Sequence, residues 1–263
     1  MTCEAYVVTT LRLIGVTWWL QLKMRSRSSF DGILSIVYPL FFATMIFFMY
    51  GQNGGQEALV AAAVGASCMG VWSAVSTTAS TTLQGERRQG TLELLVASPT
   101  SFPLTVVPAT ISMGTIGLWS LVVTLLWGRI AFGIPISFAQ PVVFVVAAVV
   151  LAFSLGLVGF LEAVASVRYR GAWAIGSLLE FPVWLICGFL VPLSLLPDWV
   201  RPIAYLLPPT WGVAAVRDAA LGGNAWPDIA LCLLTGAAYA VIGWLLARRL
   251  VDSARMRATL ALT

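Results

Sequence analysis

Two acidic residues lie inside long apolar stretches of this 263-residue sequence, where a charge is most costly. Glu162 belongs to the run of residues 142–167, and Glu180 belongs to the run of residues 173–196. An ionised carboxylate inside a bilayer usually faces a protein interior or a wet cavity. Such a pair could bind a cationic or polar group of a substrate. The alternative is structural: Glu162 extends toward water, or one carboxyl group is protonated and hydrogen-bonded.

The sequence offers little else for catalysis or metal binding. It contains no histidine, which removes the usual general base and the commonest metal ligand. Cys68, Cys187 and Cys232 lie in apolar runs without metal-ligand spacing and are expected to be packing residues. An intramembrane enzyme would have only Glu162 and Glu180 for its chemistry. We therefore predict no catalytic residue and no metal site.

Composition indicates a membrane protein. Hydrophobic residues make up 59% of the chain and charged residues 10%, with a mean hydropathy of +0.92. A soluble domain is about 25% charged. The net charge of +4 is better explained by membrane topology than by a nucleic-acid partner, which we do not expect.

The apolar runs predict an all-α integral membrane protein, with residues 1–263 forming one domain. Six runs approach or exceed the roughly 20 residues that a bilayer requires. They are residues 32–50, 58–83, 102–127, 142–167, 173–196 and 229–246. Residues 4–29 predict an amphipathic helix along the membrane surface. Four prolines in residues 197–223 exclude a continuous helix there, so short helices dipping into the outer leaflet are expected.

One stretch of the second predicted span is rich in small and hydroxyl residues. Residues 73–82 read SAVSTTASTT. Small residues let helices approach closely in lipid, so we favour helix packing over a polar substrate path for this stretch.

The distribution of basic residues predicts the orientation. Twelve of the 15 lysines and arginines lie in the N-terminal stretch, the loops after the second and fourth spans, and the C-terminal tail. Arg129, Arg201 and Arg217 fall on the opposite side. Because basic residues favour the cytoplasmic side, both termini are predicted to be cytoplasmic.

Residues 84–101, QGERRQGTLELLVASPTS, form a long polar interruption between two apolar runs. The charged residues of this loop are Glu86, Arg87, Arg88 and Glu93. Gly90 and Thr91 mark a helix start, and Pro99 marks a stop. Leu92 and Leu95 would share one face of a short helix. Such a charged, amphipathic helix between two spans predicts a docking element for a cytoplasmic partner.

Residues 86–99, ERRQGTLELLVASP, resemble the coupling-helix signature of type-2 ABC permeases, the membrane subunits of one class of ATP-binding cassette exporters. The matching residues are Gly90, Thr91, Leu92, Glu93, Leu94, Leu95, Ser98 and Pro99. A second resemblance lies in the proline-rich stretch before the last span, at Pro192, Leu196, Pro197, Trp199, Pro208 and Arg217. The resemblance implies a dimer with a second permease copy or a homologous permease, and two copies of a cytoplasmic ATPase. Residues 92–96 would seat the coupling helix, with the charged residues at its rim.

An external ATPase is also expected from the residues themselves. A phosphate-binding loop needs a lysine after a glycine pattern, but the only lysine, Lys23, follows no glycine pattern. The chain is expected to hold no cofactor of its own, whereas ATP and Mg would be bound by the partner.

The resemblance implies export across a bacterial inner membrane. Spans dominated by Val, Leu and Ala favour a hydrophobic or amphipathic substrate, such as a drug, an antibiotic or a lipid. A polysaccharide or glycolipid remains the alternative cargo, because the chain has 11 tryptophans. An ion-coupled carrier is another alternative, although the matching helix interruptions that it should show are not seen.

Overall fold

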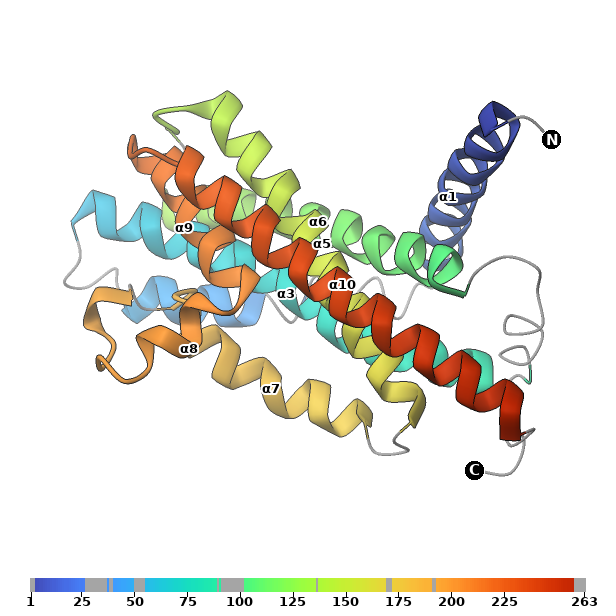
Figure 1. The fold of residues 1–263 in the computed structure, drawn as a ribbon. Helices are drawn as coiled ribbons and strands as arrows, with labels where there is room; N and C mark the ends of the chain where they lie inside the picture. The colour runs from blue at the N-terminus through green and yellow to red at the C-terminus, as the bar shows by residue number, and fades with distance from the viewer. Residues whose placement is uncertain are drawn as a thin grey trace.

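The computed structural model is a bundle of helices (Figure 1). It describes residues 3–26, 37, 40–49, 55–88, 90, 102–135, 137–168, 172–190 and 193–257. No β-strand occurs in these ranges, in agreement with the predicted all-α fold.

Helix α6 (Pro141–Arg168) is the centre of the bundle. Leu151, Leu155 and Phe160 of α6 are fully buried. The helices that pack against it are α3 (Gln56–Arg88), α5 (Phe102–Phe132), α7 (Ala172–Ile186), α9 (Pro208–Leu221) and α10 (Trp226–Arg257). Helices α3, α6 and α10 run in one direction, whereas α5 and α7 run in the other (Figure 1). This alternation is expected of a chain that crosses a membrane repeatedly.

Glycines bring the helix backbones close together where helices cross. A Cβ atom added at Gly114 of α5 would overlap the backbone carbonyl of Ala152 of α6. A Cβ atom added at Gly156 of α6 would lie 2.8 Å from the Cα of Ile111 of α5. Because lipid provides no hydrophobic drive for helix association, such close backbone contacts supply much of the attraction.

The stretch of small residues on α3 takes part in this packing. Ala79 is fully buried, and a Cβ atom added at Gly159 of α6 would lie 3.2 Å from the Ala79 Cβ. The packing interpretation of residues 73–82 is therefore confirmed at Ala79.

Four helices are long and apolar enough to cross a membrane: Glu57–Ser76, Phe102–Phe132, Pro141–Ser166 and Trp226–Asp252. They correspond to the second, third, fourth and sixth predicted spans. Of the first predicted span, residues 32–50, the structure describes chiefly a shorter apolar helix, Leu40–Met49.

Helix α7 is shorter than the fifth predicted span. It has 15 residues, which reach about 22 Å, whereas the hydrocarbon core is about 30 Å thick. The expectation of a continuous helix over residues 173–196 is wrong because Gly188 adopts a φ of 82°. This left-handed conformation commonly ends helices.

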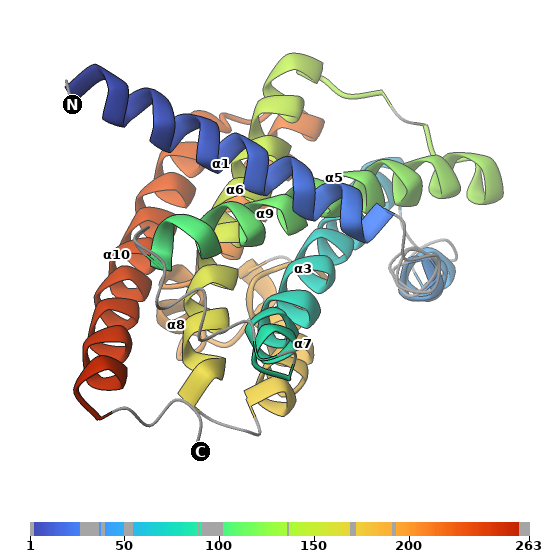
Figure 2. The same cartoon turned by 90° about the vertical axis from the view of Figure 1, so that its right-hand side faces the viewer.

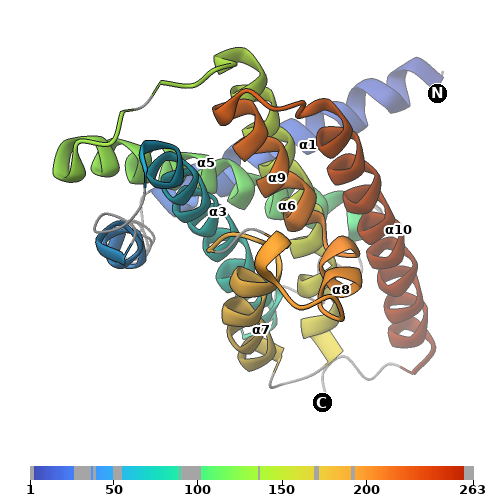
Figure 3. The ribbon, with the colours of Figure 1, turned by 90° about the vertical axis from the view of Figure 1, so that its left-hand side faces the viewer.

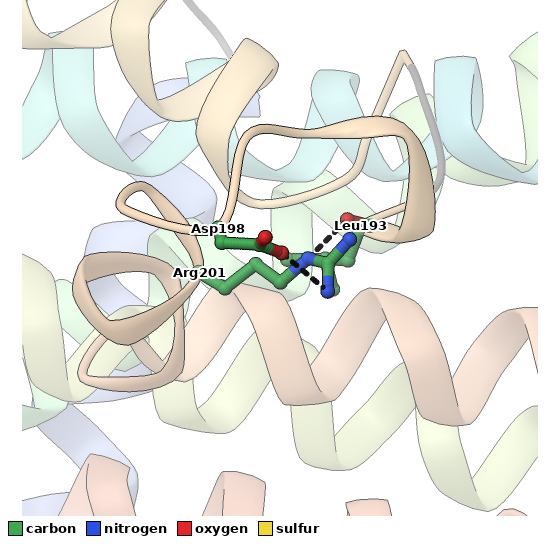
Figure 4. Close-up of polar contacts among 3 residues, drawn as sticks. All are labelled: Leu193, Asp198 and Arg201. Atoms are coloured by element: carbon green, nitrogen blue, oxygen red, sulfur yellow. Dashed lines mark hydrogen bonds and ion pairs between the residues drawn. The ribbon is translucent and has the colours of Figure 1, made fainter.

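The predicted broken helices follow α7. They begin with the short 3₁₀ helix η1 (Leu193–Leu195) and α8 (Arg201–Tyr205), and prolines occupy the first turns of α8 and α9. Arg201 connects the first two pieces: it forms an ion pair with Asp198 at 2.9 Å, and its Nε donates to the Leu193 carbonyl at 3.3 Å (Figure 4). The prolines interrupt the helix as expected, because proline lacks the N–H group that a helix interior needs.

Helix α9 is inserted into the bundle. It packs against α3, α6 and α10, and Figure 3 shows it between α3 and α10. A Cβ atom added at Gly212 would overlap the side chain of Leu151 on α6. At the other end of α9, the carbonyl groups of Ala219 and Ala220 accept the N–H groups of the two residues that precede α6, each at 3.1 Å. The end of α9 is therefore level with the start of α6.

Helix α1 (Cys3–Ser26) crosses α5 (Figure 2). Ile14 and Trp18 are half-buried, and Trp18 Nε1 donates to Thr115 Oγ1 at 3.1 Å. The opposite face is apolar as well, since Trp19 is 60% exposed and Met24 is 59% exposed. The helix is present as expected, and its location at the membrane surface stays a prediction.

Adding a methyl group at the close crossing of α5 and α6 should destabilise the bundle. We expect Gly114→Ala to lower the free energy of unfolding by about 1–3 kcal/mol, because its Cβ must displace the Ala152 backbone. Gly85→Ala on α3 is the control, since a Cβ there meets nothing within 4 Å. Thermal unfolding of the purified protein in detergent measures both variants. Equal melting temperatures would contradict the role given to this crossing.

Candidate functional site

Helices α3 and α7 bring Glu180 against Ser73. Ser73 Oγ donates a hydrogen bond to Glu180 Oε1 at 2.5 Å. Both side chains are buried, with 4% of Glu180 and 7% of Ser73 exposed. The hydroxyl group therefore replaces water beside a carboxylate that would be costly to leave unsatisfied.

Helix α6 brings the second predicted acid to the same place. Glu162 lies beside Ser76 of α3, and it is near enough to Glu180 for the two charges to interact. The Oε2 atom of Glu162 is buried and has no hydrogen-bond partner among the residues that the structure describes. The structure therefore brings the two acids of the predicted pair together between three helices.

This arrangement suits the binding of positive charge better than catalysis. Two ionised carboxylates at short range repel each other, so a bound cation or a proton on one of them is needed to relieve the repulsion. Ser73 and Ser76 add hydroxyl oxygens to the site. In the described ranges, no three acidic or cysteine side chains gather as a metal site would require.

The polar site is next to a cluster of aromatic side chains. Phe181, the residue after Glu180, contacts Trp184 edge to face with ring centroids 5.2 Å apart. Phe42 of the helix Leu40–Met49 contacts the same Trp184 at 4.9 Å. Phe181 is 54% exposed, whereas Trp184 is 2% exposed. Phe181 therefore faces the surface of the bundle, whereas the buried Trp184 follows Glu180 by one helical turn, on the same side of α7.

The basic residues of three predicted cytoplasmic segments gather at one end of the bundle. Ala79 of α3 faces Gly159 of α6, and each helix continues for nine further residues, to Arg88 and Arg168. Helix α10, which runs the same way, continues from Gly243, beside Phe160 of α6, to Arg257. This common end agrees with the topology predicted from the basic residues.

The predicted coupling segment is described only at its start. Helix α3 was expected to end at residue 83 but extends to Arg88, so that Glu86, Arg87 and Arg88 belong to its last turns. Gly90 adopts a φ of 72°, which side-chain-bearing residues rarely adopt. The other predicted coupling residues, Thr91, Leu92, Glu93, Leu95 and Pro99, lie outside the described residues. Their role therefore stays a prediction.

Arg217 is a residue whose position sequence reasoning missed. It was counted as an outside residue of a broken segment, but it lies on α9 inside the bundle, and its Nη2 donates to the Gly188 carbonyl at 2.8 Å. Its charge also acts on the buried Cys68 of α3. One signal was available: Arg217 comes directly after the apolar run GVAAV, residues 212–216.

Comparison with known proteins identifies the family. A family model described as ABC-2 type transporter matches residues 12–221, which include α3, α5, α6, α7 and α9 and most of α1. No curated protein matches the chain. The matched region also contains the two acids and the segment predicted to couple to an ATPase. The chain therefore belongs to the ABC-2 type transporter family and is the membrane-spanning permease subunit of an ABC transporter, a family that implies an ATPase partner.

Proposed function

We propose that this permease exports a hydrophobic or amphipathic molecule that carries a positive charge, such as a drug, an antibiotic or a lipid. The observation that carries the proposal is the acid pair Glu162 and Glu180, held with Ser73 between α3, α6 and α7. A neutral apolar substrate would not need two carboxyl groups at that depth, since each costs free energy there.

The surroundings of the pair support an amphipathic substrate. The spans are dominated by apolar side chains, and Trp184 follows Glu180 by one turn of α7. A molecule with one cationic centre and a large apolar body would satisfy both features. A sugar polymer would instead require many hydroxyl and amide partners along its path.

Transport in this proposal is powered by a separate ATPase. Lys23, the only lysine, lies on α1 and is exposed, and it follows Leu22 rather than a glycine-rich loop. ATP and Mg would bind to two copies of the partner, which would dock on residues 84–101 of two permease subunits. Both termini would then face the cytoplasm of a bacterial cell, with the bundle in its inner membrane and no catalytic role for this chain.

Removing one carboxylate at a time tests the substrate site. We expect Glu162→Gln and Glu180→Gln each to raise the half-saturating concentration of tetraphenylphosphonium, a lipophilic cation, by about tenfold, because a charge-assisted contact is lost. Transport of the uncharged triphenylphosphine oxide should change much less. The measurement is uptake into inverted vesicles that contain the permease and its ATPase.

Glu57→Gln is the matched control, since Glu57 is an exposed acid in the first turn of α3. Co-purification of the ATPase should be unchanged in all three variants, which separates substrate binding from assembly. If both acid variants handled the cation as the wild type does, the pair would have a structural role only.

A charge on the predicted apolar face of the coupling segment tests the power source. We expect Leu95→Asp to release or uncouple the ATPase, because burying an unpaired charge at an interface costs several kcal/mol. Glu93→Ala should do less, since an exposed ion pair contributes about 0–1 kcal/mol. Co-purification of the ATPase and substrate-stimulated ATP hydrolysis are the measurements. Retention of the partner with full coupling in Leu95→Asp would reduce residues 84–101 to an ordinary connection.

A further inference from the structure

Helix α3 contacts α7 at one point and the turn after α7 at a second point, and both contacts fit one antiparallel arrangement of the two segments. The first is the hydrogen bond from Ser73 to Glu180. The second joins Gly65 to Phe189: a Cβ atom added at Gly65 would overlap the Phe189 carbonyl oxygen. Eight residues of α3 and nine residues of the other segment separate the two points. A shift of the Phe189 backbone along α3 would therefore also shift Glu180 relative to Ser73.

The second point exists because α7 ends early. The Cys187 N–H still bonds to the Val183 carbonyl at 2.9 Å, and Gly188 then turns with a φ of 82°. Phe189 is 1% exposed, so the turn lies inside the bundle. Carbonyl groups at a helix end that water cannot reach must find other donors.

Arg217 supplies one of these donors from a different helix. Its Nη2 donates to the Gly188 carbonyl at 2.8 Å and would lie 3.4 Å from a Cβ atom at Gly65. A positive charge at the carboxyl end of a helix is also favoured by the helix dipole. Arg217 therefore lies next to both sides of this contact, Gly65 of α3 and the turn after α7.

Arg217 projects from α9, a helix that is itself well packed. Val213, Val216 and Ala220, which flank Arg217 on α9, are at most 3% exposed. The helix packs against α3 and α6 as well as α10. A side chain anchored on such a helix can hold the α7 end in place, whereas one on a surface loop could not.

We propose that Arg217 is a positioning residue for the substrate site: it fixes the end of α7 on α3 and thereby places the Glu180 carboxylate beside Ser73 and Glu162. This inference rests on the proposed function, because it assumes that Glu180 contacts the substrate. The Gly188 carbonyl, to which Arg217 donates, lies eight residues after Glu180 in the chain. Arg217 therefore acts on Glu180 through the backbone between them, without touching the substrate.

A double-mutant cycle separates positioning from general support of the fold. The variants are Arg217→Gln, Arg217→Lys, Glu180→Gln and the combination of Arg217→Gln with Glu180→Gln, each in complex with the ATPase. The readouts are the half-saturating concentration of tetraphenylphosphonium, the maximal transport rate and basal ATP hydrolysis. Residues that act through one another give non-additive effects.

We expect Arg217→Gln to raise the half-saturating concentration by at least about fivefold, with basal ATP hydrolysis within about twofold of wild type. Adding it to Glu180→Gln should raise that concentration less than twofold further, since there is no carboxylate left to place. Arg217→Lys should recover part of the loss, because a lysine keeps the charge and a donor but lacks the planar fork.

Two results bear on different parts of the argument. If Glu180→Gln lowers transport and Arg217→Gln multiplies that loss independently, the positioning role is overturned while the substrate site stands. If Glu180→Gln leaves cation transport unchanged, the proposed site is overturned, and the positioning role is overturned with it.

Gly65→Ala changes the same contact from the α3 side. It provides the test if the Arg217→Gln permease fails to assemble with the ATPase. The added methyl group must push the Phe189 carbonyl away from α3, so the half-saturating concentration should rise at least about threefold while Arg217 remains intact. Gly55→Ala, just before α3, meets nothing within 4 Å and should transport as the wild type does. Wild-type handling of the cation by Gly65→Ala would overturn the proposal.

Discussion

The structure depends on one constraint: inside a bilayer, each polar group must find its partner within the protein. Side-chain hydrogen bonds between helices meet part of this constraint. Ser154 of α6 donates to the Cys232 carbonyl of α10 at 3.1 Å, and Thr210 donates to the Ala204 carbonyl at 2.6 Å. The bond from Ser73 to Glu180 is another hydrogen bond between helices, with a carboxyl group as the acceptor. Among the described residues, the buried Oε2 atom of Glu162 lacks such a partner, as do the hydroxyl groups of Ser120 and Thr124, and the proposed function rests on the first of these.

The early end of α7 follows from the same constraint and has a wider effect. A helix of 15 residues leaves its last carbonyl groups inside the bundle, where water cannot satisfy them. The inserted helix α9 answers this need with a charged donor, and its own last carbonyls are satisfied by the residues before α6. Within the broken segment, helix α9 therefore bonds to the turn after α7 and to the residues before α6 and is largely buried, whereas Leu195, Trp199 and Leu206 before it are exposed.

Four spans could be predicted from the sequence because lipid imposes a length and a composition on each helix, and the two acids could be placed by counting residues along those helices. The end of α7 could not be predicted. Residues 183–191 read VWLICGFLV, an unbroken apolar run, and only the backbone shows that Gly188 turns. The partners of Glu180 and Arg217 lie on other helices, 107 and 29 residues away. Such pairings depend on helix register, which a single sequence does not reveal.

Helix α3 links the predicted docking end of the molecule to the acid pair. It contains no proline among its 33 residues, so it can move as one rod. Glu86, near one end, is thirteen residues from Ser73, or about 20 Å along the axis, and Gly65 lies a further two turns away. Helix α7 is bonded to this helix at Ser73, and the turn after α7 contacts it at Gly65. A displacement of the Glu86 end along the axis must therefore carry the Glu180 carboxylate with it, or break the bond to Ser73, and either result changes the geometry of the pair.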